Sequence, residues 1–183
     1  MTETWYGQAC GQPSQEYRQR ALARQRQLTK PEGALGRLET LAVELAALQG
    51  VDQPVAQRVP VVVFAGDHGV TAQGVSAYPA EVTVQMLHNF AGGGAAIAVL
   101  ARELGLPLHV WDVGSRATTA IAGVVSAKTL HGTADFSTGP AMSAADLDAA
   151  FDAGRRAVEA ACADGADLLV FGEMGIGNTT AAS

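Results

Sequence analysis

Apolar positions in the first third of the chain recur with helical spacing. Residues 14–28 are predicted to form a helix with Ser14 as its N-cap, and the proline and glycine at 29–33 then break it. A second helix is predicted from one apolar stripe with a spacing of three or four residues: Leu35, Leu38, Leu41, Ala42, Leu45 and Leu48. Residues 50–60 resemble a linker, so residues 1–55 are expected to form a separate helical part.

The pattern changes at residue 59, where the run 59–65 is rich in β-branched residues and typical of a strand buried on both faces. Further strands are expected at 108–113, 124–130 and 167–171, and helices at 79–91, 95–104 and 143–163. Ser143 and Asp146 resemble a capping box at the start of the last helix. Strands that alternate with helices predict a three-layer α/β/α fold with a parallel sheet over residues 56–183.

Composition narrows the class of protein. Hydrophobic residues make up 48% of the 183 residues and charged residues 16%, which is enough for a sizeable core. The net charge of −6 argues against a general nucleic-acid binder, because such proteins carry an excess of basic residues. No uninterrupted apolar run has the length of a membrane span. Cys10 and Cys162 fit no zinc spacing, and the first residues lack a signal core. We expect a cytoplasmic protein without a metal or cofactor.

Ligands of parallel sheets bind at the carboxyl ends of the strands, so the residues after each strand are the candidates. Asp67 and His68 follow the first strand, where an aspartate could hold a ribose hydroxyl or a cation and a histidine could transfer a proton. They could equally be a backbone cap and a packed loop residue. Asp112 follows the second strand and either joins this site or binds the amides of a turn.

A candidate slot for a flat heteroaromatic ligand comes next along the chain. Tyr78, Val82, Gln85 and Met86 share one helical face, which offers an aromatic ring, two apolar groups and one amide. The same spacing is also that of an ordinary core face, and the sequence leaves both interpretations open.

The segment 172–180 has the order strand, glycine loop, helix start, which is the arrangement that binds phosphate. The candidate phosphate-binding residues are Gly175, Ile176, Gly177, Asn178, Thr179 and Thr180. The ending Gly-Lys-Ser/Thr of a Walker loop is missing, which favours a monophosphate over a triphosphate. A tight turn without ligand is the alternative. Glu173 would face a cationic ring or developing positive charge on a sugar, or would form a salt bridge.

The chain stops at Ser183, in what is expected to be the first turn of a helix. Because so short a helix is marginal by itself, we expect the natural protein to continue.

Taken together in this order, the motifs resemble the nicotinate-nucleotide–dimethylbenzimidazole phosphoribosyltransferase family of cobalamin lower-ligand synthesis. The segments that carry the resemblance are LTKPEGALGRLE at 28–39, AGDHGV at 65–70, VSAYP at 75–79 with QM at 85–86, GGGA at 92–95, DVG at 112–114 and GEMGIGNTT at 172–180. They cover nearly the whole chain and correspond to the N-terminal portion of the family.

The resemblance implies the transfer of the phosphoribosyl group of nicotinate mononucleotide to 5,6-dimethylbenzimidazole, giving α-ribazole 5′-phosphate and nicotinate. It also implies a Rossmann-like fold, a homodimer, and neither metal nor cofactor. By position, the benzimidazole pocket would be lined by Ser76, Tyr78, Val82, Gln85 and Met86. The glycine loop at 175–180 would hold the nucleotide phosphate, and Glu173 would lie near the reacting ribose. The family's general-base glutamate has no counterpart among these 183 residues.

Two other functions remain open at this point. One is a non-catalytic module that binds a nucleotide or a corrinoid precursor. The other is a different enzyme of small phosphate esters that uses Asp67 and His68.

Overall fold

The computed structural model describes residues 5–163 and 165–183, which divide into two units, Met1–Gln57 and Arg58–Ser183. We call them the helical unit and the sheet unit. The helical unit contains the short 3-10 helix η1 (Trp5–Gly7) and the α-helices α1 (Gln15–Gln27) and α2 (Arg37–Gln49). The predicted cap of α1 is confirmed, because the Ser14 hydroxyl accepts a hydrogen bond from the backbone N–H of Tyr17 at 3.4 Å.

The face of α2 that is buried is not the predicted leucine stripe. The buried residues of α2 are Val43, Ala46 and Ala47, whereas Leu38 and Leu48 are 64% and 65% exposed. Small side chains let the chain before α1 come close, and the N–H of Ser14 donates to the carbonyl oxygen of Ala47 at 2.8 Å. The helical period was therefore predicted correctly, but it does not say which apolar face packs.

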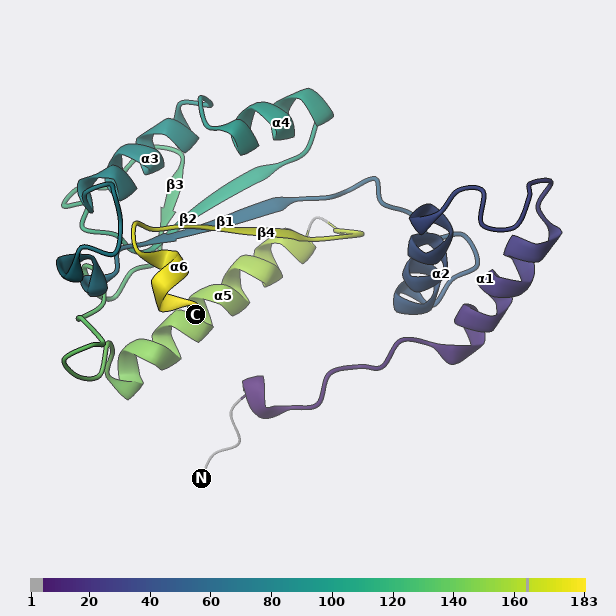
Figure 1. The fold of residues 1–183 in the computed structure, drawn as a ribbon, viewed down its shortest axis with the longest axis horizontal. Helices are drawn as coiled ribbons and strands as arrows, with labels where there is room; N and C mark the ends of the chain where they lie inside the picture. Colours follow the sequence, from purple (N-terminus) through teal and green to yellow (C-terminus); the bar gives the residue numbers. More distant parts are fainter. Residues whose placement is uncertain (1–4, 164) are drawn as a thin grey trace. The chain divides into compact units, whose positions relative to one another are not determined.

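The sheet unit is a four-stranded parallel sheet in the order β3-β2-β1-β4. Its elements are β1 (Val61–Gly66), η2 (Gly69–Gln73), α3 (Glu81–Ala91), α4 (Ala96–Leu104), β2 (Leu108–Gly114), β3 (Val124–Ser126), α5 (Ala144–Ala163), β4 (Val170–Met174) and α6 (Asn178–Ala181). Helices α3 and α4 lie on one side of the sheet and α5 on the other, as Figure 1 shows. The predicted α/β/α fold is confirmed.

Alternating side chains of β1 supply a core on each side of the sheet. Val61 and Val63 join a cluster with Leu87 and Phe90 of α3, while Val62 packs with Trp111 and the alanines of α5. Both β1 faces are therefore covered, as the run of β-branched residues predicts. The predicted capping box of α5 is confirmed, because Ser143 and Asp146 exchange hydrogen bonds of 3.0 and 3.2 Å.

Three predicted boundaries are corrected. Helix α3 begins at Glu81, so Pro79 precedes it, and the carbonyl of Pro79 accepts the N–H of Val82 at 3.1 Å. The third strand ends at Ser126, because the chain then turns Lys128 inward.

The fourth strand is Val170–Met174 and not 167–171. Asp167 binds the backbone N–H and the guanidinium of Arg58 at 2.9 and 3.0 Å, which holds it outside the ladder. Gly172 and Glu173 belong to the strand because they pair with Val63 and Phe64 of β1.

The segment Glu81–Leu104 has 24 residues, and an 18-residue window within it has a mean hydropathy of 1.3, which is the length and composition of a membrane span. The structure divides it into α3 and α4 around a turn at 92–95. Leu87, Phe90 and Ala98 of these helices are buried in the core of the sheet unit, whereas Leu100 and Leu104 are 56% and 68% exposed.

Candidate functional site

The candidate residues after three strands meet at one edge of the sheet. Gly66 of β1 pairs with Gly114 of β2, and Ala65 pairs with Met174 of β4. The residues that follow these pairs therefore leave the sheet at the same carboxyl edge. The sequence-predicted groups at 67–68 and 175–180 follow these pairs, whereas Asp112 and Glu173 lie within the last residues of β2 and β4 at the same edge.

Asp67 fastens three of the segments at this edge. It is 2% exposed, its N–H donates to the carbonyl of Gly114 at 3.0 Å, and its own carbonyl accepts from Thr133 at 3.0 Å. One carboxylate oxygen, Oδ2, accepts the backbone N–H of Arg116 at 2.7 Å. The other, Oδ1, is buried without a hydrogen-bond partner in the described part of the chain. Asp67 thus has the capping role, and one of its oxygens remains unused.

His68 lies directly against the glycine loop. A Cβ added at Gly175 would be 2.9 Å from Nε2 of His68, so only glycine lets the two segments approach this closely. Burial lowers the pKa of His68, and this outweighs the charges of Glu173 and Asp67, which raise it. The imidazole is therefore neutral near pH 7 and offers both a donor and an acceptor.

The glycine loop is tied to α3 and keeps two amides free. The N–H of Ile176 donates to the hydroxyl of Thr83 at 3.1 Å, and Thr83 is fully buried in α3. The N–H groups of Gly175 and Gly177 make no hydrogen bond within the described residues. Gly177 has φ +88°, a conformation that favours glycine. Two free amides on a fixed loop are suited to an anion.

Glu173 and Asn178 form a pair beside these amides. The amide Nδ2 of Asn178 donates to Oε1 of Glu173 at 2.5 Å, and Oδ1 of Asn178 accepts the N–H of Thr179 at 2.8 Å. Glu173 is exposed, so its carboxylate is oriented by Asn178 while it faces solvent. The salt bridge considered for Glu173 is not seen among the described residues.

A pocket of about 400 Å³ opens next to the loop. Its lining is Gly69, Thr71, Ala72, Ser76, Ala77, Tyr78, Pro79, Ala80 and Arg116. Two of the five residues predicted for the benzimidazole pocket, Ser76 and Tyr78, therefore line it. Val82, Gln85 and Met86 are outside this lining, and Met86 packs against the core under α3. We call this hollow the ring pocket.

The ring pocket and the glycine loop touch each other. A Cβ at Gly177 would lie 3.0 Å from the methyl carbon Cγ2 of Thr71, which belongs to the ring-pocket lining. Thr83 joins the loop to the helix that follows the pocket. A flat ligand in the pocket and an anion on the loop would thus be neighbours.

Asp112 forms a separate, fully partnered cluster. Its carboxylate accepts from the N–H and hydroxyl of Ser115, both at 2.7 Å, and from Nζ of Lys128 at 2.9 Å. Burial raises the pKa of Asp112, but these hydrogen bonds together with the Lys128 charge outweigh it and hold the pKa below the usual range. Asp112 therefore fixes the turn after β2, which is the structural one of its two predicted roles.

Four residues at this edge were not found from the sequence: Thr71, Thr83, Arg116 and Lys128. Their positions carry no motif, since each is defined by a partner far along the chain. Within residues 5–163 and 165–183, no three His, Cys, Asp or Glu side chains gather as a metal site.

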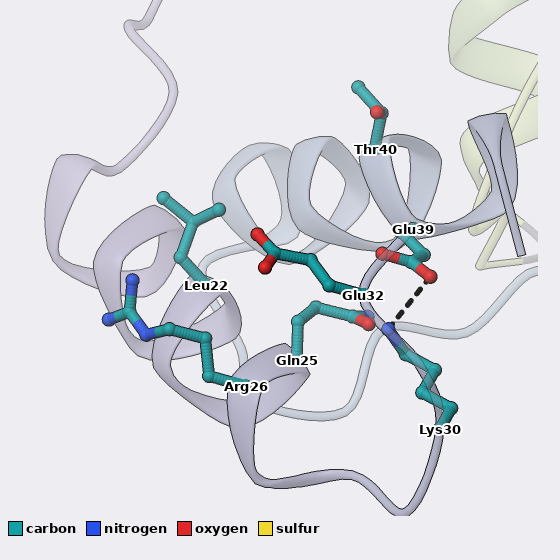
Figure 2. A pocket seen from close by; sticks show the side chains of 7 residues that line it. All are labelled: Leu22, Gln25, Arg26, Lys30, Glu32, Glu39 and Thr40. Carbon is teal, nitrogen blue, oxygen red and sulfur yellow. Dashed lines mark ion pairs between the residues drawn. The ribbon is translucent and has the colours of Figure 1, made fainter. Parts of the chain in front are cut away.

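The helical unit has a hollow of its own, about 470 Å³ in volume, shown in Figure 2. Lys30 and Glu39 form an ion pair of 2.7 Å across it, and the N–H of Leu35 donates to Glu39 at 3.1 Å. The Lys30 hydrogen bond, followed by that of Leu35, lowers the pKa of Glu39. With Gly33 and Gly36 at positive φ, this pair explains the segment 28–39 as a clamped turn between α1 and α2.

Comparison with known proteins gives the class and then the family. A family model described as phosphoribosyltransferase matches residues 10–183. A nicotinate-nucleotide–dimethylbenzimidazole phosphoribosyltransferase from Bradyrhizobium sp. (strain BTAi1) is 61% identical over 183 residues, which are 100% of this chain and 52% of the relative. The enzyme of that name from Pseudomonas aeruginosa (strain PAO1) is 51% identical over 184 residues, with the same two shares.

A solved structure agrees with these relatives. The crystal structure of the nicotinate-nucleotide–dimethylbenzimidazole phosphoribosyltransferase from Thermus thermophilus matches with a TM-score of 0.88 and 49% identity, over 92% of this chain and 52% of that one. The chain belongs to the nicotinate-nucleotide–dimethylbenzimidazole phosphoribosyltransferase family. It spans about half the length of the curated relatives that it matches.

Proposed function

We propose that the chain takes part in the transfer of phosphoribose from nicotinate mononucleotide to 5,6-dimethylbenzimidazole, a step of cobalamin lower-ligand synthesis. The observation that carries this proposal is the contact between Thr71 of the ring pocket and Gly177 of the glycine loop. A two-substrate transfer needs a flat acceptor and an anchored phosphate side by side. The names of the relatives supply the two substrates.

In the proposed reaction, the ring pocket holds the benzimidazole and the glycine loop holds the phosphate of the nucleotide. A ring nitrogen of the benzimidazole attacks C1′ of the ribose, the bond from C1′ to the pyridinium nitrogen breaks, and its electron pair neutralises the departing nicotinate ring. The benzimidazole then gives up its N–H proton to solvent water, because the family's general-base glutamate has no counterpart among these 183 residues. The free amides of Gly175 and Gly177, with the hydroxyls of Thr179 and Thr180, would hold the phosphate.

Glu173 would act on the sugar. Positive charge develops at C1′ as the bond to nicotinate lengthens, and an oriented carboxylate stabilises it. The hydrogen bond from Asn178 fixes Glu173 before substrate binds. Holding both substrates in line is worth up to about 7–11 kcal/mol of the barrier in well-oriented systems.

Val82, Gln85 and Met86 remain proposed members of the acceptor site through their place on α3, which follows Ser76 and Tyr78 in the chain, although Met86 also packs against the core. A phosphate-ester hydrolysis that uses Asp67 is less well supported, because Asp67 is 2% exposed and already caps Arg116. The homodimer and the cytoplasmic location implied by the resemblance stay predictions. Light scattering after size-exclusion chromatography tests the first.

The decisive experiment compares two proteins. One is the 183-residue chain, and the other joins these 183 residues to the remaining part of the Bradyrhizobium sp. (strain BTAi1) relative. Both are incubated with nicotinate mononucleotide and 5,6-dimethylbenzimidazole, and α-ribazole 5′-phosphate is sought by mass spectrometry. A Tyr78→Ala variant should lose acceptor affinity, whereas Tyr6→Ala in the helical unit is the matched control.

Product from either protein supports the transferase. Binding of both substrates without product from the joined chain would instead favour the non-catalytic binding module. Failure of both proteins to bind either substrate would overturn the proposal.

A further inference from the structure

The half-buried imidazole of His68 contacts the glycine loop but takes no part in the proposed function. The carbonyl of His68 accepts the N–H and the hydroxyl of Thr71 at 3.2 and 2.9 Å, which fixes its backbone. A Cβ added at Gly177 would lie 3.6 Å from Cβ of His68, and one at Gly175 would lie 2.9 Å from Nε2. Neither ring nitrogen forms a hydrogen bond within the part of the chain that the structure describes. The polar atoms of the ring are therefore available beside the loop.

The distance from His68 to the free amide of Gly175 suits a shared anion. The Cβ position and the nitrogen of one residue are about 2.5 Å apart, so Nε2 of His68 is at most about 5.4 Å from the amide nitrogen of Gly175. Two hydrogen bonds of about 2.8 Å that meet at one oxygen span up to about 5.6 Å. One phosphate oxygen can therefore accept from the amide and from the imidazole at once.

The charges around the imidazole decide its response to an anion. Burial lowers the pKa of His68, and the two carboxylates that face the ring raise it to a smaller extent: Glu173, near the end of β4, and the preceding Asp67. A phosphate on the loop adds further negative charge, and the segment 172–180 contains no lysine or arginine to offset it. A nearby negative charge favours the protonated form of a histidine. A bound phosphate would therefore draw a proton onto this ring.

We propose that His68 is a phosphate-binding residue of the glycine loop, and that its imidazole takes up a proton from solvent when the anion binds. This inference rests on the proposed function, because it takes the glycine loop as the phosphate site. It adds a cationic donor to a loop that has none of its own. Nicotinate mononucleotide should then gain affinity as the pH falls through the titration of His68, and the gain should level off once the imidazole of the free protein is charged.

The test compares three proteins: the 183-residue chain, His68→Gln and His109→Gln. Glutamine keeps an N–H donor but does not titrate. His109 is half-buried near the amino end of β2, at the opposite edge of the sheet, so its variant is the matched control. Calorimetry measures the affinity for nicotinate mononucleotide between about pH 5.5 and pH 8.5, above the range in which carboxylates ordinarily titrate.

The phosphate of the nucleotide also titrates in this range, but it does so equally for all three proteins. The affinity of the unaltered chain relative to His68→Gln should be about five- to ten-fold higher at about pH 5.5 than at about pH 8.5. His109→Gln should behave as the unaltered chain does. Nuclear magnetic resonance should show that saturating nucleotide raises the pKa of His68 by about one unit, which is the same linkage measured on the ring.

Circular dichroism checks that both variants fold. A relative affinity that stays constant with pH, or a pKa of His68 that the nucleotide does not move, would overturn the role of His68 and leave the phosphate site standing. If the nucleotide does not bind the unaltered chain at any pH, the glycine loop is not the phosphate site and the proposed function fails with it.

Discussion

The substitution Gly175→Ala probes how the glycine loop is fixed to the sheet. A Cβ at this position would lie 2.1 Å from the carbonyl oxygen of Gly66 and 2.9 Å from Nε2 of His68. An ordinary contact needs about 1 Å more than the first distance. The nearest atom belongs to the backbone at the end of β1, so it has no side-chain rotamer by which to move away. The loop must instead shift outward, away from His68.

Overpacking of this kind costs about 1–3 kcal/mol, and a clash with backbone belongs to the upper part of that range. At about 2–4 °C per kcal/mol for a chain of this size, a loss of about 3 kcal/mol lowers the melting temperature by about 6–12 °C. The shift would also move the free amides of Gly175 and Gly177. Affinity for nicotinate mononucleotide should therefore fall together with the melting temperature.

Thermal unfolding followed by circular dichroism measures the effect. Gly139→Ala is the matched control, because an added Cβ there meets nothing within 4 Å and the residue has no positive φ. If Gly175→Ala melts within about 2 °C of Gly139→Ala, the loop does not pack on Gly66 as the structure shows. The glycine loop would then not be fixed in the position proposed for holding the phosphate.

Three further outcomes follow from single contacts. Asp112→Asn should make the free energy of unfolding depend less on pH in acid. The lowered pKa of Asp112 contributes stability that is complete above about pH 4 and is lost as pH falls further. The free energies of unfolding from urea titrations at about pH 5 and pH 2 should therefore differ less for the variant than for the unaltered chain. Ser143→Ala removes the cap of α5 and should cost about 1 kcal/mol in urea unfolding, whereas an unchanged midpoint would mean that the box with Asp146 adds nothing. Thr83→Val leaves the N–H of Ile176 without its acceptor and should lower the free energy of unfolding by about 1–3 kcal/mol. The same variant should weaken the binding of nicotinate mononucleotide. Full affinity by calorimetry would mean that the hydrogen bond between α3 and the glycine loop does not support the phosphate site.

The order of the elements could be read from the sequence because each depends on a local pattern. The run of β-branched residues at β1 and the capping box at α5 are both visible within a few neighbours. The fourth strand was placed three residues too early for the opposite reason. Gly172 and Glu173 are weak strand formers, and only their pairing with β1 puts them in the sheet. The clamp between Asp167 and Arg58, which excludes the start of the expected strand, joins residues far apart in the sequence.

The candidate site shows the same difference between residues with a local sequence pattern and residues defined by distant contacts. Asp67 and the glycine loop could be predicted because they follow strands, and Asp112 because it lies near the end of one, since parallel strands share a carboxyl edge. Thr71, Thr83 and Arg116 could not, because their importance lies in contacts with Gly177, Ile176 and Asp67, each from another part of the chain. The leucines of α2 show a similar limit, since the helical spacing predicted the helix but not its buried face.

The glycines of the site are explained by close approach rather than by flexibility. Gly69 would bring a Cβ to 2.4 Å from the carbonyl carbon of Ala134, and Gly175 would bring one to 2.1 Å from Gly66. The segments after β1 and β4 are therefore packed backbone to backbone, with Asp67 and Thr83 as fixed bonds between them and their neighbours. Such an edge cannot open to admit a bulky ligand without breaking these contacts. It leaves the ring pocket and the amides of Gly175 and Gly177, which are the two features that the proposed flat acceptor and single phosphate require.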